Sequence, residues 1–350
     1  MRQPTFAILG FLIGGIGVAP ALAVPSLDAY ALSAAGRSNV GAAGPPFSCS
    51  TFGPDPASAI FRGGLYVGLP TDGSICGVGV DARSVTAAAG QVQVASSLAV
   101  GFGPPIDPRT FVGTAAGRAG FGRLGASAAG SYTGSSDGFT VAGSQASARQ
   151  VETMTFGGAS GAGVYRPTFT IDGSFFIVGR TYSEIEFNYA AATGPRYLSF
   201  RIQNNGGSFS FYANGGYQAS LPGMTVTGDL VNGLTVAGST TFSMDIPIVF
   251  GVALDVNFQM WAASLPASNV NLLTASAGNV SFLSSATLTG IQVLNASGQA
   301  LNAFSISAGS GTLYGPGGVM AVPEPGSSLL MTAGLLTLLW LRARARPVSA

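Results

Sequence analysis

The sequence predicts an all-β protein: an antiparallel β-sandwich or jelly-roll-like ectodomain with an N-terminal signal helix and a single C-terminal transmembrane helix. Short runs of alternating apolar and polar residues recur along the chain, and turn residues interrupt them about every 8–12 residues. Glycine contributes 52 and proline 20 of the 350 residues, which suits a protein with many tight turns. Before residue 327, sustained helical periodicity is absent from the sequence except in the apolar run near the N-terminus.

The composition favours a folded core and argues against nucleic acid as a partner. Only 8% of the residues are charged, but the chain has 22 phenylalanines and 10 tyrosines, enough apolar material to build a core. Residues 24–321 carry eleven arginines and thirteen acidic residues, a net charge of −2, and the chain has no lysine or histidine. A nucleic-acid-binding domain would need a basic patch or stripe instead.

The first 23 residues have the organisation of a secretory signal peptide. Arg2 precedes an apolar run over residues 6–18, and Ala21 and Ala23 then form an A-x-A cleavage site. We expect cleavage after Ala23. The alternative is an uncleaved anchor, which the small-residue site after the apolar run disfavours.

Residues 24–110 are expected to form an irregular, loop-rich β segment, because prolines are frequent there and the apolar runs are short. This segment contains both cysteines of the chain, Cys49 and Cys76. An exported protein meets an oxidising compartment, so a disulfide between them is the favoured interpretation. Two free thiols are the alternative.

Residues 111–318 carry the strongest strand signals and are assigned to the β-sandwich ectodomain. The sequence TFTIDGSFFIV over residues 168–178 predicts a hairpin with a tight turn at Asp172 and Gly173. The sequence RYLSFRIQNNGGSFSFYA over residues 196–213 predicts a second hairpin, with its turn at the Asn-Asn-Gly-Gly sequence.

A further strand is predicted over residues 254–261, where two kinds of residue alternate. One face would carry only apolar side chains and the other would carry polar side chains with one tryptophan, the pattern of a half-buried strand. The first set is Leu254, Val256, Phe258 and Met260, and the second is Asp255, Asn257, Gln259 and Trp261.

The reactive side chains of the sequence predict a protein that is not an enzyme and uses no cofactor or metal. Without histidine, the chain has neither a Ser-His-Asp nor a Cys-His nucleophile system. Two distant cysteines make a poor zinc ligand set, and Asp172, Asp229 and Asp245 stand too far apart in sequence to indicate a calcium loop. The glycine clusters lack the strand-turn-helix context of a nucleotide-binding loop.

Glu184 and Glu186 form the carboxylate pair of greatest chemical interest. In a strand they share one face with Tyr182 and Asn188, while Ile185 and Phe187 face the core. Three interpretations stay open. They are a solvent-facing polar stripe, a sugar-binding face formed by these residues or by Trp261 with Asp255 and Asn257, and the acid pair of a glycosidase. The glycosidase is the remote alternative, because a further acid that some jelly-roll glycosidases carry is missing.

The C-terminal segment begins with a stiff motif and continues into an apolar stretch. The motif is Val322, Pro323, Glu324 and Pro325, and it is extended because proline restricts both itself and the residue before it. Residues 327–341 follow without a charge. As a helix they would reach about 22 Å, which is a marginal span for a bilayer core of about 30 Å.

A basic cluster closes the chain. Arg342, Arg344 and Arg346 follow the apolar stretch, and Trp340 lies at the expected membrane interface. Arginines in this position can snorkel and mark a cytoplasmic boundary. The alternative, a buried C-terminal helix, is disfavoured because the stretch is apolar on every face and ends in positive charge.

Residues 319–346 resemble a PEP-CTERM sorting signal, with the Val-Pro-Glu-Pro motif, the short transmembrane helix and the basic cluster in the same order at the extreme C-terminus. The Pro-Val-Ser-Ala extension after Arg346 is a slight departure. The resemblance implies recognition by an exosortase, a membrane protease that removes the tail during export in Gram-negative bacteria that make exopolysaccharide. The same C-terminal domain is also labelled as that of ice-binding proteins, which implies nothing about ice for this chain.

The two targeting segments and the lack of catalytic residues together predict an exported protein of the cell envelope or extracellular matrix, structural or associated with exopolysaccharide and biofilm. Its expected partners are an exosortase-type membrane protease, the inner membrane as a transient anchor, and exopolysaccharide. Its expected final location is the cell surface or the exterior. The alternative is a carbohydrate-binding, lectin-like module, with a glycoside hydrolase as the remote alternative.

Overall fold

The computed structural model describes residues 24–38, 49–51, 74–102, 108–134, 140–179, 181–189, 196–204, 209–213, 216–218, 221–229, 232–268 and 275–320. The predicted signal peptide over residues 1–23 and the predicted sorting motif, membrane helix and basic cluster lie outside these ranges. Among the described residues, no helix combines the length and the apolar character needed to cross a bilayer.

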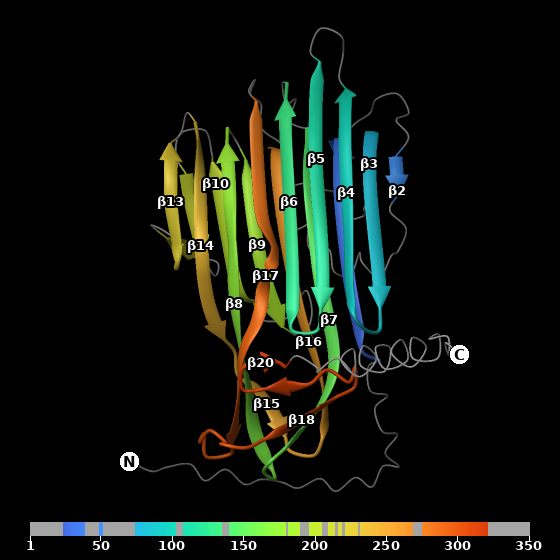
Figure 1. Cartoon of the computed structure of the whole chain (residues 1–350). Helices are drawn as coiled ribbons and strands as arrows, with labels where there is room; N and C mark the ends of the chain where they lie inside the picture. The colour runs from blue at the N-terminus through green and yellow to red at the C-terminus, as the bar shows by residue number, and fades with distance from the viewer. Residues whose placement is uncertain are drawn as a thin grey trace, which may run out of the picture.

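The described part of the chain is all-β, with two antiparallel sheets packed together like a sandwich, as the sequence predicts (Figure 1). Sheet A has the strand order β12-β11-β10-β9-β16-β7-β1-β3-β2, with β18 beside β7. Its strands are β1 (Ser26–Ser38), β2 (Cys49–Thr51), β3 (Ser74–Ala87), β7 (Thr140–Gly157), β9 (Tyr182–Tyr189), β10 (Arg196–Asn204), β11 (Phe209–Ala213), β12 (Gly216–Gln218), β16 (Ala253–Ser268) and β18 (Ser305–Ala308).

Sheet B has the order β13-β14-β8-β17-β6-β5-β4, with β15 beside β8. A short hairpin of β19 (Tyr314–Gly315) and β20 (Gly318–Val319) follows near the end of the described chain. The strands of sheet B are β4 (Gln91–Phe102), β5 (Arg109–Gly120), β6 (Arg123–Thr133), β8 (Ala162–Val178), β13 (Met224–Asp229), β14 (Gly233–Ser243), β15 (Ile246–Val249) and β17 (Ser276–Asn295).

The segment expected to be irregular, residues 24–110, supplies three long strands to this sandwich. β1 pairs with β7 on one side and with β3 on the other, both within sheet A. β4 forms an edge of sheet B by pairing with β5. Strands from before and after residue 110 therefore share the same two sheets.

The two predicted hairpins have different outcomes. β10 and β11 pair antiparallel from Asn204 opposite Phe209 onward, so the predicted pairing is confirmed, while residues 205–207 of the predicted turn lie outside the described ranges. The hairpin at Asp172 and Gly173 is wrong, because β8 continues through both residues and pairs there with the middle of β14. Gly173 is required by packing instead, since a Cβ at this position would collide with the ring of Phe282.

Aromatic side chains fill the core between β8 and β17 of sheet B and β9 and β16 of sheet A. The ring centroid of Phe169 lies 4.8 Å from that of Phe187 and 4.9 Å from that of Phe258. Phe175 and Phe282 meet edge to face at 5.1 Å. These ring contacts stabilise the core beyond the burial of apolar surface alone. Most of the large aromatic side chains that are fully buried lie on these four strands.

Around Gly117, the core between β1, β5 and β7 is built from alanine and glycine instead. A Cβ on Gly117 of β5 would collide with the backbone carbonyl of Ser147 and lie 2.8 Å from that of Tyr30. The backbones of the two sheets therefore approach each other closely here. The buried small residues around this approach are Ala29, Ala31, Ala115, Ala146 and Ala148.

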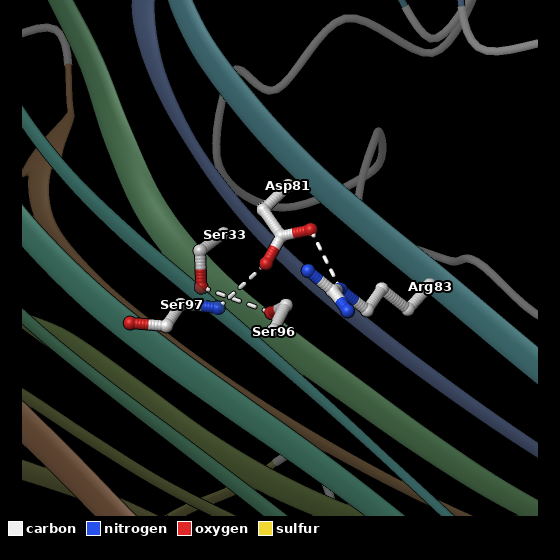
Figure 2. A network of polar contacts seen from close by, with 5 residues as sticks. All are labelled: Ser33, Asp81, Arg83, Ser96 and Ser97. Carbon is white, nitrogen blue, oxygen red and sulfur yellow. Dashed lines mark hydrogen bonds and ion pairs between the residues drawn. The ribbon is translucent and has the colours of Figure 1, made fainter.

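A polar network joins the two sheets beside this close approach (Figure 2). The Ser33 hydroxyl on β1 lies 3.1 Å from that of Ser96 on β4. Asp81 on β3 accepts hydrogen bonds from the Ser97 backbone N–H at 2.8 Å and from the Arg83 Nε at 2.9 Å. The Ser97 N–H and then Arg83 lower the pKa of Asp81, so its carboxylate stays charged and keeps β3 tied to β4.

A buried carboxylate fastens the segment that ends the described chain. Glu152 on β7 is fully buried, and its oxygens accept hydrogen bonds from the Ser310 backbone N–H at 2.9 Å and the Ser310 hydroxyl at 2.5 Å. The Tyr314 hydroxyl lies 3.5 Å from the same carboxylate. The segment from β18 to β20 is thus part of the folded body.

Candidate functional site

The face of β9 that points away from sheet B is polar and buried. On β9, Ile185 and Phe187 belong to the core, so Glu184 and Glu186 project from the opposite side of the sheet. Both glutamates are only 2% exposed. The solvent-facing stripe that the sequence allowed is therefore not what the structure has.

Neighbouring strands bring the predicted ligand-face residues together. Trp261 on β16 is the direct cross-strand partner of Glu186 on β9 and of Ser147 on β7. Cβ atoms of directly opposed residues are about 4.5–5.5 Å apart. We call this surface the polar strip; its residues are Gln145 and Ser147 of β7, Tyr182, Glu184, Glu186 and Asn188 of β9, Ser199 and Arg201 of β10, and Gln259 and Trp261 of β16.

Glu184 is held by donors on its own strand and on β10. The Tyr182 hydroxyl donates a hydrogen bond to Oε2 of Glu184, and the Ser199 hydroxyl donates to Oε1 at 3.2 Å. Arg201 is the cross-strand partner of Glu184, and its guanidinium carbon lies 5.8 Å from the centre of the Tyr182 ring. The carboxylate is therefore fixed in place.

Burial dominates the electrostatics of this carboxyl group. Removal from water raises the pKa of Glu184 to about 7, and the nearby charge of Glu186 adds to the rise. The hydrogen bond from Tyr182, the charge of Arg201 and the hydrogen bond from Ser199 act in the opposite direction. Burial also raises the pKa of the Tyr182 hydroxyl, which therefore remains protonated and able to donate.

Several buried polar atoms of the polar strip lack hydrogen-bond partners within the part of the chain that the structure describes. They are Nε1 of Trp261, Oγ of Ser147, Oδ1 of Asn188 and both side-chain polar atoms of Gln145. Each of these side chains is more than nine-tenths buried. Buried polar groups are normally paired, so this concentration on one surface calls for an explanation.

A charged pair borders the polar strip on the β1 side. Arg149 on β7 forms an ion pair with Asp28 on β1, with Nη2 of the arginine 2.8 Å from Oδ2 of the aspartate. The Thr86 hydroxyl of β3 donates to the other oxygen of Asp28 at 2.8 Å. These contacts cross three adjacent strands and hold the border of the strip in register.

The arrangement suits hydrogen bonding to a hydroxyl-rich group better than it suits acid–base catalysis. Glu184 and Glu186 lie on one strand, and their direct partners on β16 and β10 are Trp261, Ala263, Ser199 and Arg201, none of which is acidic. A glycosidase needs two carboxyl groups on either side of a bond that it cleaves. The polar strip offers a ring, amide and hydroxyl groups, and carboxylate acceptors on a single surface.

The other predicted sites are only partly described. The register places Cys49 directly opposite Cys76 in the pairing of β2 and β3, which matches the short Cα separation that a disulfide needs. No group of three or more acidic or cysteine side chains among the described residues is arranged to hold a metal ion. The signal-cleavage residues, the Val-Pro-Glu-Pro motif and the three C-terminal arginines lie outside the described ranges.

Sequence reasoning missed several members of this surface. Gln145 and Ser147 join it because β7 pairs with β16, a contact between segments more than a hundred residues apart. The alternation of polar and small residues in β7 was the available signal, but it does not identify the partner strand.

Comparison with family models, with characterised proteins and with solved structures gives no match to this chain.

Proposed function

We propose that this protein is exported, held in the inner membrane by its C-terminal helix and then released by an exosortase-type protease to the cell surface or the exterior. The observation that carries the proposal is the order of three features after residue 321: a Val-Pro-Glu-Pro motif, an uncharged apolar stretch and an arginine cluster. The signal-peptide pattern of residues 1–23 supports the same route.

In this proposal the sandwich is a jelly-roll-like ectodomain. A signal helix precedes it, and one transmembrane helix within residues 327–341 follows it. Its role is structural or associated with exopolysaccharide in an envelope or biofilm matrix. The absence of histidine from the sequence supports a non-enzymatic role, because it removes the commonest general base.

Substitution of the two prolines of the sorting motif tests the route. In cells with an active exosortase, a Pro323→Ala, Pro325→Ala variant should accumulate in the inner-membrane fraction, while the unaltered protein reaches the surface or medium. Pro222→Ala, which changes an exposed proline of the body, is the matched control and should be released normally. Equal release of all three proteins would count against recognition of the motif.

A second candidate function, glycan binding by the polar strip, is favoured by the unpartnered polar atoms around Trp261. A sugar offers both an apolar ring face for tryptophan and hydroxyl groups for the neighbouring amide, hydroxyl and carboxylate groups. Because the strip is buried, binding would require these side chains to become accessible.

A glycan array tests this candidate with the full exported protein. Binding to an acidic or neutral polysaccharide should fall at least tenfold in Trp261→Ala and Glu186→Gln, and should be unchanged in Asp172→Asn, which alters an exposed carboxylate of sheet B. Binding that survives both changes would exclude the polar strip as the site.

A further inference from the structure

One end of the sandwich carries most of the large apolar side chains that are exposed in the described part of the chain. Of the eight large hydrophobic residues that are conspicuously exposed, five belong to β15, the turn after it, or the segment around β19 and β20. They are between 40 and 56% exposed, and they are Val249, Val252, Leu313, Val319 and Met320.

Hydrogen bonds show that these segments share one end of the molecule. The Phe250 N–H in the turn after β15 donates to the carbonyl of Gly161, the residue before β8, and the Gly251 N–H donates to the carbonyl of Phe156 near the end of β7. β18 pairs with the same last residues of β7. Figure 1 shows β15, β18 and β20 together at the lower end of the sandwich. We call this surface the apolar end.

The chain is hydrogen-bonded to the rest of the domain at the apolar end up to its last described residue. Glu152 holds Ser310, the Ile291 N–H donates to Pro316 at 2.9 Å, and the Met320 N–H donates to Leu313 at 2.9 Å. A Cβ on Gly318 would collide with the carbonyl oxygen of Leu288, so β20 lies directly against β17. The tail therefore leaves the body from this surface.

Only six residues separate Met320 from the uncharged stretch that begins at Ser327. A fully extended chain of that length spans at most about 25 Å. If a connection this short joins the folded domain to a membrane helix, the apolar end, from which the chain leaves the domain, must stay close to the bilayer. Exposed apolar patches on soluble domains mark sites that contact a protein or a membrane.

We infer that the apolar end rests against the lipid interface while the tail anchors the protein, with the strands pointing away from the bilayer. The inference rests on the proposed membrane anchoring. The valine, leucine and methionine side chains of this end suit the boundary between headgroups and acyl chains. The far end of β6 would then lie about 35 Å further from the membrane, given the rise per residue of a strand.

Two single-cysteine positions test this orientation in the full chain with its tail. Gly317 is exposed near the apolar end and has open space for a side chain, and Thr133 is exposed at the opposite end of β6. Gly317→Cys and Thr133→Cys would each be labelled with bimane and placed in vesicles of phosphatidylethanolamine and phosphatidylglycerol that contain a headgroup spin-labelled lipid. A sample without an introduced cysteine measures any labelling of Cys49 and Cys76.

The label at position 317 should be quenched at least threefold more than the label at position 133. The double variant Val252→Ser, Leu313→Ser should halve that quenching, while Val112→Ser, Val226→Ser, which alters exposed valines of sheet B, should leave it unchanged. Equal quenching at both positions in protein that floats with the vesicles would overturn the orientation and leave the anchor intact.

Two further outcomes would reject the inference for different reasons. Protein that fails to float with the vesicles would contradict the anchoring itself. A label at position 317 that the lipid probe does not quench, in protein that sediments as a dimer with this label shielded from aqueous quencher, would show that a second copy covers the apolar end.

Discussion

Trp261 on β16 and Glu186 on β9 are direct cross-strand partners, and each is at most 3% exposed on the outer face of sheet A. The pairing places an indole beside a carboxylate in surroundings that contain Glu184 and Asn188. Nε1 of Trp261 has no hydrogen-bond partner in the described part of the chain. The contribution of Trp261 to stability should therefore come from its ring and not from its N–H group.

Substitutions at Trp261 separate these two contributions. Trp261→Phe keeps most of the ring and removes an unpaired donor, so the free energy of unfolding should change by less than about 1 kcal/mol. Trp261→Ala removes the ring and should cost about 3–5 kcal/mol. Urea unfolding of both variants checks the difference. A large loss in Trp261→Phe would show that the N–H group has a partner.

The buried carboxyl group of Glu184 should make stability depend on pH. Its pKa is about 7 in the folded protein and near 4.5 when unfolded, so folding favours its neutral form. The associated stabilisation is fully present below about pH 4.5 and is lost as the pH rises through 7. The difference between the two pKa values corresponds to roughly 3 kcal/mol.

Glu184→Gln should abolish this part of the pH dependence, because glutamine stays neutral. The measurement is the free energy of unfolding of both proteins between pH 4.5 and 8, where the wild-type protein should fall relative to the variant. Asp172→Asn, an exposed change, serves as the control. Parallel curves for wild type and Glu184→Gln would contradict the raised pKa.

A methyl group at Gly117 should force the two sheets apart. Gly117→Ala places its Cβ against the backbone of Ser147 and Tyr30, atoms that cannot rotate away, and should destabilise by about 1–3 kcal/mol. Gly120→Ala on the same strand meets its nearest atom at 3.7 Å, an ordinary contact, and should change stability much less. Thermal unfolding compares the two, and equal losses would mean that the sheets do not meet closely at Gly117.

Removal of the Glu152 carboxylate should loosen the end of the folded body. Glu152→Ala leaves the Ser310 N–H without its acceptor and the Ser310 hydroxyl with only Oγ1 of Thr312, and a loss of roughly 2–4 kcal/mol in the free energy of unfolding is expected. Limited proteolysis should then cut within residues 305–320 first. Asp172→Ala, on the outer face of β8, is the control. Unchanged protection of that segment would show that Glu152 is not what holds it.

The strand content and the inner faces could be predicted from the sequence because alternation fixes which side chains share a surface. Leu254, Val256, Phe258 and Met260 lie on one face of β16 as predicted, with Val256, Phe258 and Met260 in the core. The opposite face was expected to be solvated, but Gln259 and Trp261 are buried too. Period-2 patterning identifies the polar face without revealing whether anything covers it.

The error at Asp172 and Gly173 has a specific physical cause. An Asp-Gly pair between two apolar runs is a strong local turn signal, but Gly173 serves to admit the ring of Phe282 against the strand. That contact joins residues more than a hundred positions apart, so local sequence cannot distinguish it from a turn. The grouping of Gln145, Ser147 and Trp261 could not be predicted for the same reason, since it depends on the pairing of β7 with β16.

The C-terminal mass of the mature protein tests the central claim most directly. Intact-mass and peptide mass spectrometry of protein from cells with an active exosortase should give a chain that lacks the apolar stretch and arginine cluster of residues 327–350, and cells without the protease should retain them. A surface or secreted chain that still ends at Ala350 beside an active exosortase would contradict the proposed processing.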